Sequence, residues 1–332
     1  MTRRATRSLE QGIANTFALA ALLLIGLVID AKPQTPPLID DQAPRSYQLS
    51  VNVDLVVLHA TVRDRKGQFA SDLRAEHFEV YEDGVRQSIR LFRHEDTPVT
   101  VGLVIDHSGS MRRKLSEVLA AARIFVQSSN PEDEMFVVNF NENVSLGLPD
   151  AIRFTNRSNE LEHAISRTPA TGKTALYDAV VKARERLQAG SRDKKVLIVI
   201  SDGGDNASAS NLAQVLTIAE RSATLVYAIG IFDKDDPDRN PNVLKRLARA
   251  TGGEAFFPGQ LSEVVAICER IARDIRHQYT IGYVSSNAAH PGAFRSIRVV
   301  AGATGKRKLL VRTRSGYIAA GESRPIEDEG GK

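Results

Sequence analysis

The fold is decided by the stretch Val99-Thr100-Val101-Gly102-Leu103-Val104-Ile105, which runs directly into Asp106-His107-Ser108-Gly109-Ser110. The first seven residues are almost continuously apolar, as is typical of a parallel strand that is buried on both faces. The next five place one carboxylate and two hydroxyl groups on a single loop. Oxygen ligands of this kind are those that Mg²⁺ and Mn²⁺ prefer. The stretch therefore indicates a parallel sheet with candidate metal ligands at the carboxyl end of one strand.

The region around this strand, from residue 98 to 277, alternates short apolar runs with segments whose apolar residues recur at helical spacing. Strands are expected at residues 99–105, 135–140, 196–200, 224–231 and 254–257, and helices at residues 115–126, 176–187, 212–219, 243–250 and 261–277. Strands that alternate with helices form mostly parallel sheets, because each crossover helix packs on a face of the sheet. The predicted fold class is α/β, with a Rossmann-like central sheet and helices on both faces.

The segments on either side of this region, residues 46–97 and 278–320, have the patterns of β-strands. In the first, the apolar alternation changes parity near Val57, which predicts a bulge or a bend. Residues 78–92 predict a hairpin closed by Asp83-Gly84. In the second, strands are expected at residues 279–284, 294–301 and 308–313. The flanks hold about ninety residues, the size of a small β-sandwich. We expect them to pair, so that the α/β domain is inserted in a β-sandwich, although two separate β units also fit the sequence.

The N-terminus, residues 1–31, has the features of a signal peptide or a signal anchor. A basic start precedes a mostly apolar run from Phe17 to Ile29, which is shorter than the roughly twenty residues that span a bilayer. Residues 32–45 are proline-rich and predict a linker, and residues 321–332 predict a disordered tail. We therefore expect the protein outside the cytoplasm, either periplasmic or secreted, or held at a membrane only by an uncleaved N-terminal helix.

The composition limits the classes of protein to which this chain can belong. It has 332 residues and a net charge of +4, which is too weak a positive charge to indicate nucleic-acid binding. The single cysteine, Cys268, rules out an internal disulfide and a cysteine-based zinc cluster. It falls on the apolar stripe of the helix expected at residues 261–277, where we expect a buried structural side chain. No feature of the sequence defines an oligomeric state.

Five residues that carry side-chain oxygens are candidates for one metal site: Asp106, Ser108, Ser110, Thr174 and Asp202. Ligands of an open parallel sheet bind at the carboxyl ends of its strands. Asp106 and Asp202 both follow apolar strands, and Thr174 opens a helix, so all of them can converge at that edge. Two carboxylates and three hydroxyls leave a divalent cation nearly neutralised, with a position open for a partner's carboxylate. In the alternative interpretation, Asp106 and Ser108 only cap the following helix.

Three neighbours of these residues are interpreted as structural. His107 is expected to be a solvent-exposed loop residue, and Asp205 is expected to be a turn residue. The segment Arg112-Arg113-Lys114 is expected to form a solvated first helical turn, with a basic rim for an acidic partner as the alternative.

The order of these motifs resembles the metal-ion-dependent adhesion site of von Willebrand factor type A domains, over residues 98–277. The similarity includes the stretches Thr174-Ala175-Leu176-Tyr177-Asp178-Ala179 and Ile200-Ser201-Asp202-Gly203-Gly204-Asp205-Asn206. The flanks resemble an exported bacterial group called VWFA-related proteins, through His77-Phe78-Glu79-Val80-Tyr81-Glu82-Asp83-Gly84 and Arg314-Ser315-Gly316-Tyr317.

The resemblance implies a bound Mg²⁺, with Mn²⁺ or Ca²⁺ as the alternatives. Ser108 and Ser110 would bind the ion directly, and Asp106, Thr174 and Asp202 would bind it directly or through water. It also implies a protein partner that presents a Glu or Asp carboxylate, but it does not identify that partner.

Enzyme interpretations fit the sequence less well. A phosphate-binding loop at Gly172-Lys173-Thr174 would need a glycine where Arg167 stands. A serine hydrolase would need glycines in place of the residues that flank Ser108 at two-residue spacing, and no convincing general base stands beside the candidate site. We expect a non-enzymatic, extracytoplasmic adhesion or scaffold module. The alternatives are an exported structural protein whose metal only stabilises loops and, less favoured, a metal-dependent hydrolase.

Overall fold

The strand that ends at Asp106 lies at the centre of a six-stranded sheet. In a computed structural model, which describes residues 55–232, 239–287, 292–302 and 309–319, this sheet has the order β10-β9-β8-β5-β6-β7. Its strands are β5 (Val99–Asp106), β6 (Glu134–Phe140), β7 (Val144–Leu146), β8 (Lys194–Ser201), β9 (Leu225–Gly230) and β10 (Ala255–Phe256). All neighbouring strands are parallel except β6 and β7. The predicted mostly parallel sheet is confirmed. The predicted signal segment, linker and tail lie outside the described residues.

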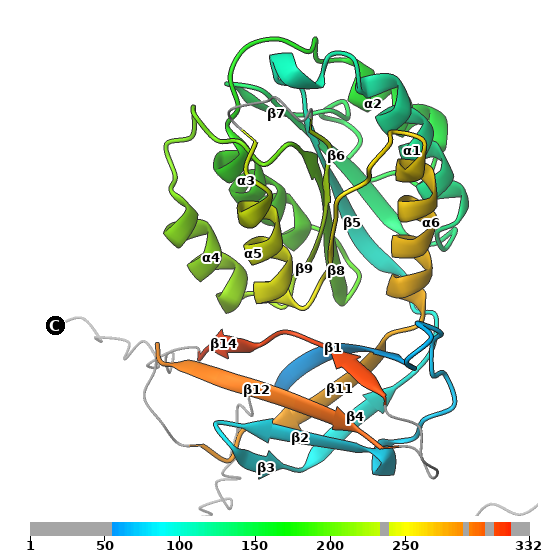
Figure 1. Cartoon of the computed structure of the whole chain (residues 1–332), viewed down its shortest axis with the longest axis vertical. Coiled ribbons are helices and arrows are strands. Elements are labelled where there is room, and N and C mark those ends of the chain that lie inside the picture. Colours follow the sequence, from blue (N-terminus) through cyan, green and yellow to red (C-terminus); the bar gives the residue numbers. More distant parts are fainter. Residues whose placement is uncertain (1–54, 233–238, 288–291, 303–308, 320–332) are drawn as a thin grey trace, which may run out of the picture. The chain divides into compact units, whose positions relative to one another are not determined.

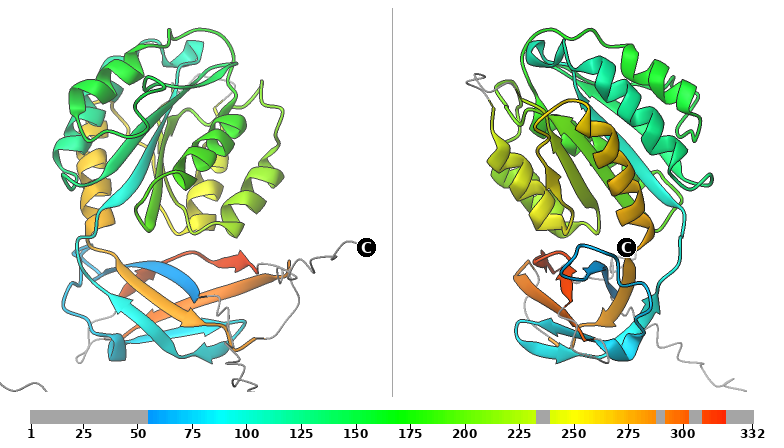
Figure 2. Two further views of the ribbon diagram at one scale, coloured as in Figure 1. Left: turned by 180° about the vertical axis from the view of Figure 1, so that it is seen from behind. Right: turned by 45° about the vertical axis from the view of Figure 1, so that its right-hand side comes forward.

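Helices cover both faces of this sheet. In the described part of the chain they are α1 (Leu115–Gln127), α2 (Ser158–Ser166), α3 (Leu176–Gln188), α4 (Leu212–Arg221), α5 (Pro241–Thr251) and α6 (Glu263–Arg276). Helices α1, α2 and α6 lie on one face, and α3, α4 and α5 lie on the other (Figures 1 and 2). Cys268 is buried in α6, as predicted. None of the helices within the described ranges is long and apolar enough to cross a membrane.

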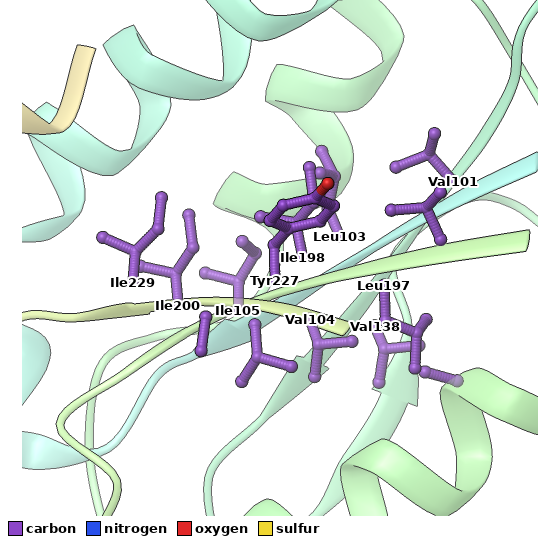
Figure 3. Packing of buried hydrophobic residues seen from close by; sticks show 14 of the residues in the cluster. Val101, Leu103, Val104, Ile105, Val138, Leu197, Ile198, Ile200, Tyr227 and Ile229 are labelled. Atoms are coloured by element: carbon purple, nitrogen blue, oxygen red, sulfur yellow. The ribbon is translucent and has the colours of Figure 1, made fainter. Parts of the chain in front are cut away.

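The central strands are buried on both faces, and this is why their sequences are continuous apolar runs. Every residue of β5 is buried. Leu103 and its partner Ile198 point to one face, while Val104 and Leu197 point to the other (Figure 3). Each large apolar side chain buried in this way contributes about 1.5–3 kcal/mol. The double-sided core therefore holds the carboxyl ends of β5 and β8 firmly side by side.

The two flanks form a pair of four-stranded sheets, β13-β1-β11-β4 and β14-β12-β2-β3. Their strands are β1 (Leu55–Arg63), β2 (Phe78–Glu82), β3 (Val85–Gln87), β4 (Ile89–Arg93), β11 (Tyr279–Val284), β12 (Phe294–Ala301), β13 (Leu310–Arg312) and β14 (Gly316–Ile318). Strand β1 of the first flank pairs with β11 and β13 of the second, and β2 pairs with β12. Phe78, Val80 and Tyr279 belong to one shared core. The α/β domain is thus inserted in a small β-sandwich.

Residues 86–92, predicted to be one strand of a hairpin, belong to two strands in different sheets. Strand β3 pairs with β2 across the predicted Asp83-Gly84 turn, whereas β4 pairs with β11. The chain changes sheets at Ser88, where the Gln87 side chain bonds to both the hydroxyl and the amide of Ser286. The bend predicted near Val57 is not seen as a register shift. Instead, β1 exchanges β11 for β13 after Ala60.

Candidate metal centre

The ends of β5 and β8 bring two predicted ligands to one edge of the sheet. Asp106 is the last residue of β5, and Asp202 follows Ser201, the last residue of β8. The strands are parallel neighbours, with Ile105 opposite Ile200. Asp106 is 0% exposed and Asp202 is 2% exposed. The topology therefore places two buried carboxylates where the predicted site requires them.

Hydrogen bonds fix the orientation of Asp106. Its Oδ1 accepts a bond from the Ser108 amide at 2.8 Å, and its Oδ2 accepts one from the Ser201 hydroxyl at 2.6 Å. The Ser201 Oγ also accepts a bond from the Gly203 amide at 3.0 Å. Ser201 thus holds both the carboxylate and the turn after β8. Ser201 was not predicted to belong to the site, although a polar residue at the end of an otherwise apolar strand marks it in the sequence.

Two serines connect the β5 loop to Asp202. The short helical turn that follows β5 (Gly109–Met111) places Ser108 Oγ 3.1 Å from Ser110 Oγ. Ser110 Oγ donates a hydrogen bond to Asp202 Oδ2, and Asp202 Oδ1 accepts one from the Gly204 amide at 3.1 Å. Four of the five predicted ligands are therefore linked to one another by direct contacts.

Thr174 approaches the same loops through its backbone. It is 6% exposed and lies just before α3. The Gly109 amide donates to the Gly172 carbonyl at 3.2 Å, and the Thr171 amide donates to the His107 carbonyl at 2.9 Å. Among the described residues, the Thr174 hydroxyl forms no hydrogen bond with the other four candidates. The structure thus brings its loop against the serine loop through backbone hydrogen bonds.

The environment of Asp106 favours a nearby cation. Burial, and after it the negative charge of Asp202, raises the pKa of Asp106 to about 6. Within the described ranges, Asp106 forms no ion pair with a lysine or an arginine. A divalent ion would supply the positive charge, and carboxylate and hydroxyl oxygens are ligands that such hard ions accept. The donor set of Asp106, Ser108, Ser110, Thr174 and Asp202 therefore fits Mg²⁺, Mn²⁺ or Ca²⁺.

This donor set differs from metal sites that are built mainly from His, Cys, Asp and Glu side chains. In the part of the chain that the structure describes, no group of three or more His, Cys, Asp or Glu side chains is arranged to hold a metal. A metal at the β5–β8 edge would therefore depend on hydroxyl oxygens in addition to its two carboxylates.

Two expectations about neighbouring side chains are wrong. His107 was expected to be exposed, but it is 0% exposed, with its Nε2 3.2 Å from Asn139 Oδ1. Burial lowers the pKa of its imidazole. Lys114 was expected in a solvated turn, but it is buried and donates to the Ile231 carbonyl at 3.2 Å. Arg112 and Arg113 are exposed. The segment after β5 packs against the edge of the sheet, so the polar side chains of His107 and Lys114 face inward.

The comparisons with known proteins concern mainly the α/β domain. Residues 101–204 match the family model of the von Willebrand factor type A domain. The inter-alpha-trypsin inhibitor heavy chain H2 of Mus musculus is 24% identical over 227 residues, which cover 64% of this chain and 23% of that protein. The chain thus spans about a quarter of the length of this curated relative.

Solved structures with a similar fold are more distant in sequence. A von Willebrand factor type A structure from Catenulispora acidiphila is 14% identical, with a TM-score of 0.48 over 82% of this chain and 76% of that one. Proximal thread matrix protein 1 from the mussel byssus, in a structure with a zinc-occupied MIDAS motif, is 15% identical. Its TM-score is 0.47 over 57% of this chain and 48% of that one. By the match of residues 101–204, this chain contains a von Willebrand factor type A domain.

Proposed function

We propose that this chain is a metal-dependent protein-binding module that acts outside the cytoplasm as an adhesion or scaffold protein. Von Willebrand factor type A domains are protein-interaction modules, and residues 101–204 belong to one. The proposed metal dependence is supported by one observation, the convergence of two buried carboxylates and two serine hydroxyls at the β5–β8 edge. A divalent cation held there, Mg²⁺ in the first instance, would be open to a Glu or Asp carboxylate of a partner protein.

The charge of the donor set supports binding of an acidic ligand. Two carboxylates and three neutral hydroxyls leave a divalent ion without an excess of negative charge around it. A partner's carboxylate can then replace a water ligand of the ion. Both carboxylate oxygens of Asp106 already accept a hydrogen bond, one from the Ser108 amide and one from the Ser201 hydroxyl. This arrangement favours binding over catalysis, which would need a free general base beside the ion.

The first test measures ion binding and partner capture with one substitution. Ser110→Ala removes a hydroxyl from a half-buried position and leaves the core intact. We expect its affinity for Mg²⁺, measured by isothermal titration calorimetry, to fall by at least about tenfold. Ser116→Ala, an exposed serine on α1, is the matched control and should bind as the wild type does. Equal affinities of the two variants would argue against a metal ligand at Ser110.

Partner capture then separates the functional candidates. Residues 45–320 serve as bait for envelope and secreted fractions, in Mg²⁺ or in EDTA. A protein retained only in Mg²⁺, and lost with Ser110→Ala, would support metal-dependent binding. Capture that is unchanged by EDTA would overturn metal-dependent binding and would place the binding surface elsewhere on the protein. Ion binding without metal-dependent capture would favour a metal that only stabilises loops. Turnover of a phosphate or ester substrate, lost in Asp106→Ala, would favour a hydrolase.

A further inference from the structure

We propose that Asn206 is a positioning residue of the metal centre, which holds Thr174 in place and joins its loop to the Asp202 loop. This inference rests on the proposed metal site. Asn206 Oδ1 accepts a hydrogen bond from the Thr174 amide at 2.9 Å. The amides of Asn206 and Ala207 both donate to the Thr174 carbonyl at 3.0 Å. Both backbone polar groups of Thr174 are therefore fixed by the segment that follows Asp202.

The helix that starts after Thr174 has no cap of its own. The residue before α3 is Ala175, whose side chain cannot accept a hydrogen bond. Asp205 Oδ2 instead accepts from the Tyr177 amide at 2.9 Å, and Ser208 Oγ accepts from the Asp178 amide at 3.1 Å. These are amides of the first turn, which an isolated helix leaves unpaired. The loop after β8 thus defines where α3 begins.

The contacts are reciprocal. The Asp178 carboxylate accepts hydrogen bonds from the Ala209 amide at 2.8 Å and the Ser210 amide at 2.9 Å. We call Asp178, Asp205, Asn206 and Ser208 the α3 latch. The latch ties the start of α3 to the loop that carries Asp202, and Asn206 is the member that contacts Thr174 directly. Two ligands far apart in sequence are thereby placed by one set of hydrogen bonds.

Removal of the Asn206 side chain should release Thr174 and leave the core in place. Asn206 is exposed, so its truncation opens no cavity. The Thr174 amide, in a residue that is 6% exposed, would lose its acceptor. Partners that orient metal ligands typically contribute 10–100-fold to metal affinity.

The test compares two exposed asparagines of the same loop in the full-length chain. Asn206→Ala should bind Mn²⁺ about tenfold more weakly than the wild type by isothermal titration calorimetry. Asn211→Ala is the matched control, because Asn211 caps α4 through the Gln214 amide at 3.0 Å. This control should unfold at a temperature similar to that of Asn206→Ala in the absence of metal, yet bind Mn²⁺ as the wild type does. An equal loss of affinity in both variants would assign the effect to loop stability and overturn the proposal.

A double-mutant cycle shows whether Asn206 acts through Thr174. Thr174→Val removes the hydroxyl, so Asn206→Ala should weaken Mn²⁺ binding little or not at all in that background. The same loss in both backgrounds would overturn the positioning role. Wild-type chain that binds neither Mn²⁺ nor Mg²⁺ nor Ca²⁺ would overturn the metal site itself, and this inference with it. Wild-type chain that binds Mn²⁺ no better than Asn206→Ala would overturn only the role of Asn206.

Discussion

His59 is a buried imidazole on β1, 8% exposed, with Nδ1 3.3 Å from the Thr280 hydroxyl. Burial, and after it the positive charges of Lys194 and Arg314, lowers its pKa from 6.5 to about 3. Between these pH values the unfolded chain binds a proton that the folded chain does not, so stability is lost as the pH falls from 6.5 towards 3. At pH 5 this group should cost about 2 kcal/mol of unfolding free energy.

The His59→Gln variant should lack this part of the acid sensitivity. Urea unfolding at pH 7 and pH 5 gives the loss of stability for each chain. We expect the wild type to lose about 2 kcal/mol more than the variant between the two pH values. The comparison uses differences within each chain, so any cost of the substitution at pH 7 cancels. An identical loss in both chains would show that folding does not lower the pKa of His59.

Residue types and their order predicted which side chains gather at the sheet edge, but not which of them are buried. Asp106 and Asp202 follow apolar strands, so their places could be inferred. His107 and Lys114 lie in a loop and a turn, where no periodicity indicates the direction of a side chain. Their burial depends on contacts with Asn139 and Ile231, which lie far away in the sequence. Asn206 was missed for the same reason, since its role depends on Thr174.

At the level of elements, Gly102 in β5 is required by packing rather than by backbone conformation. A Cβ atom at this position would lie 2.6 Å from Phe136 Cζ and 2.7 Å from Leu197 Cδ2. Both side chains are almost completely buried in the core of the sheet, so they can move little. Gly102→Ala should therefore lower the free energy of unfolding by about 1–3 kcal/mol.

Urea denaturation checks this prediction against Gly259→Ala. A Cβ atom at Gly259 would lie 3.8 Å from Glu263 Oε1, which is an ordinary van der Waals distance. That control should stay within about 0.5 kcal/mol of the wild type. If Gly102→Ala is as stable as the control, then the core around β5 adjusts more easily than its burial indicates.

The long elements could be predicted because their patterns are strong. Strand β5 and helix α3 occur where the apolar runs and the helical spacing place them. The short strands β7 and β14 were missed, since three residues carry too little periodicity. The nine-residue helix α2 was missed as well. The division of residues 86–92 into β3 and β4 could not be predicted either, because the alternation of a strand does not indicate which sheet the strand joins.

At the level of the whole molecule, the pairing of two flanks could be inferred from their size, but the residues that join them to the α/β domain could not. Asp274 on α6 is 0% exposed. It accepts hydrogen bonds from Arg63 of the first flank at 2.9 Å, from Arg312 of the second flank, and from the Tyr227 hydroxyl of β9 at 2.7 Å. Nothing in the spacing of these residues predicts the cluster. This cluster explains why a charged residue, Asp274, occupies the buried side of α6.

The last prediction concerns this cluster. Asp274→Asn keeps the shape of the side chain and removes its charge, which leaves Arg63 and Arg312 without their shared buried partner. Loss of one member of a buried ion pair is strongly destabilising, so the free energy of unfolding should fall by about 3 kcal/mol. The control is Asp96→Asn, because Asp96 pairs with Arg276 at 2.8 Å while 39% of its side chain is exposed. Such a pair contributes about 1 kcal/mol or less. Equal costs of the two substitutions in urea unfolding would mean that the arginines find other partners. Each flank would then be anchored to the α/β domain independently of Asp274.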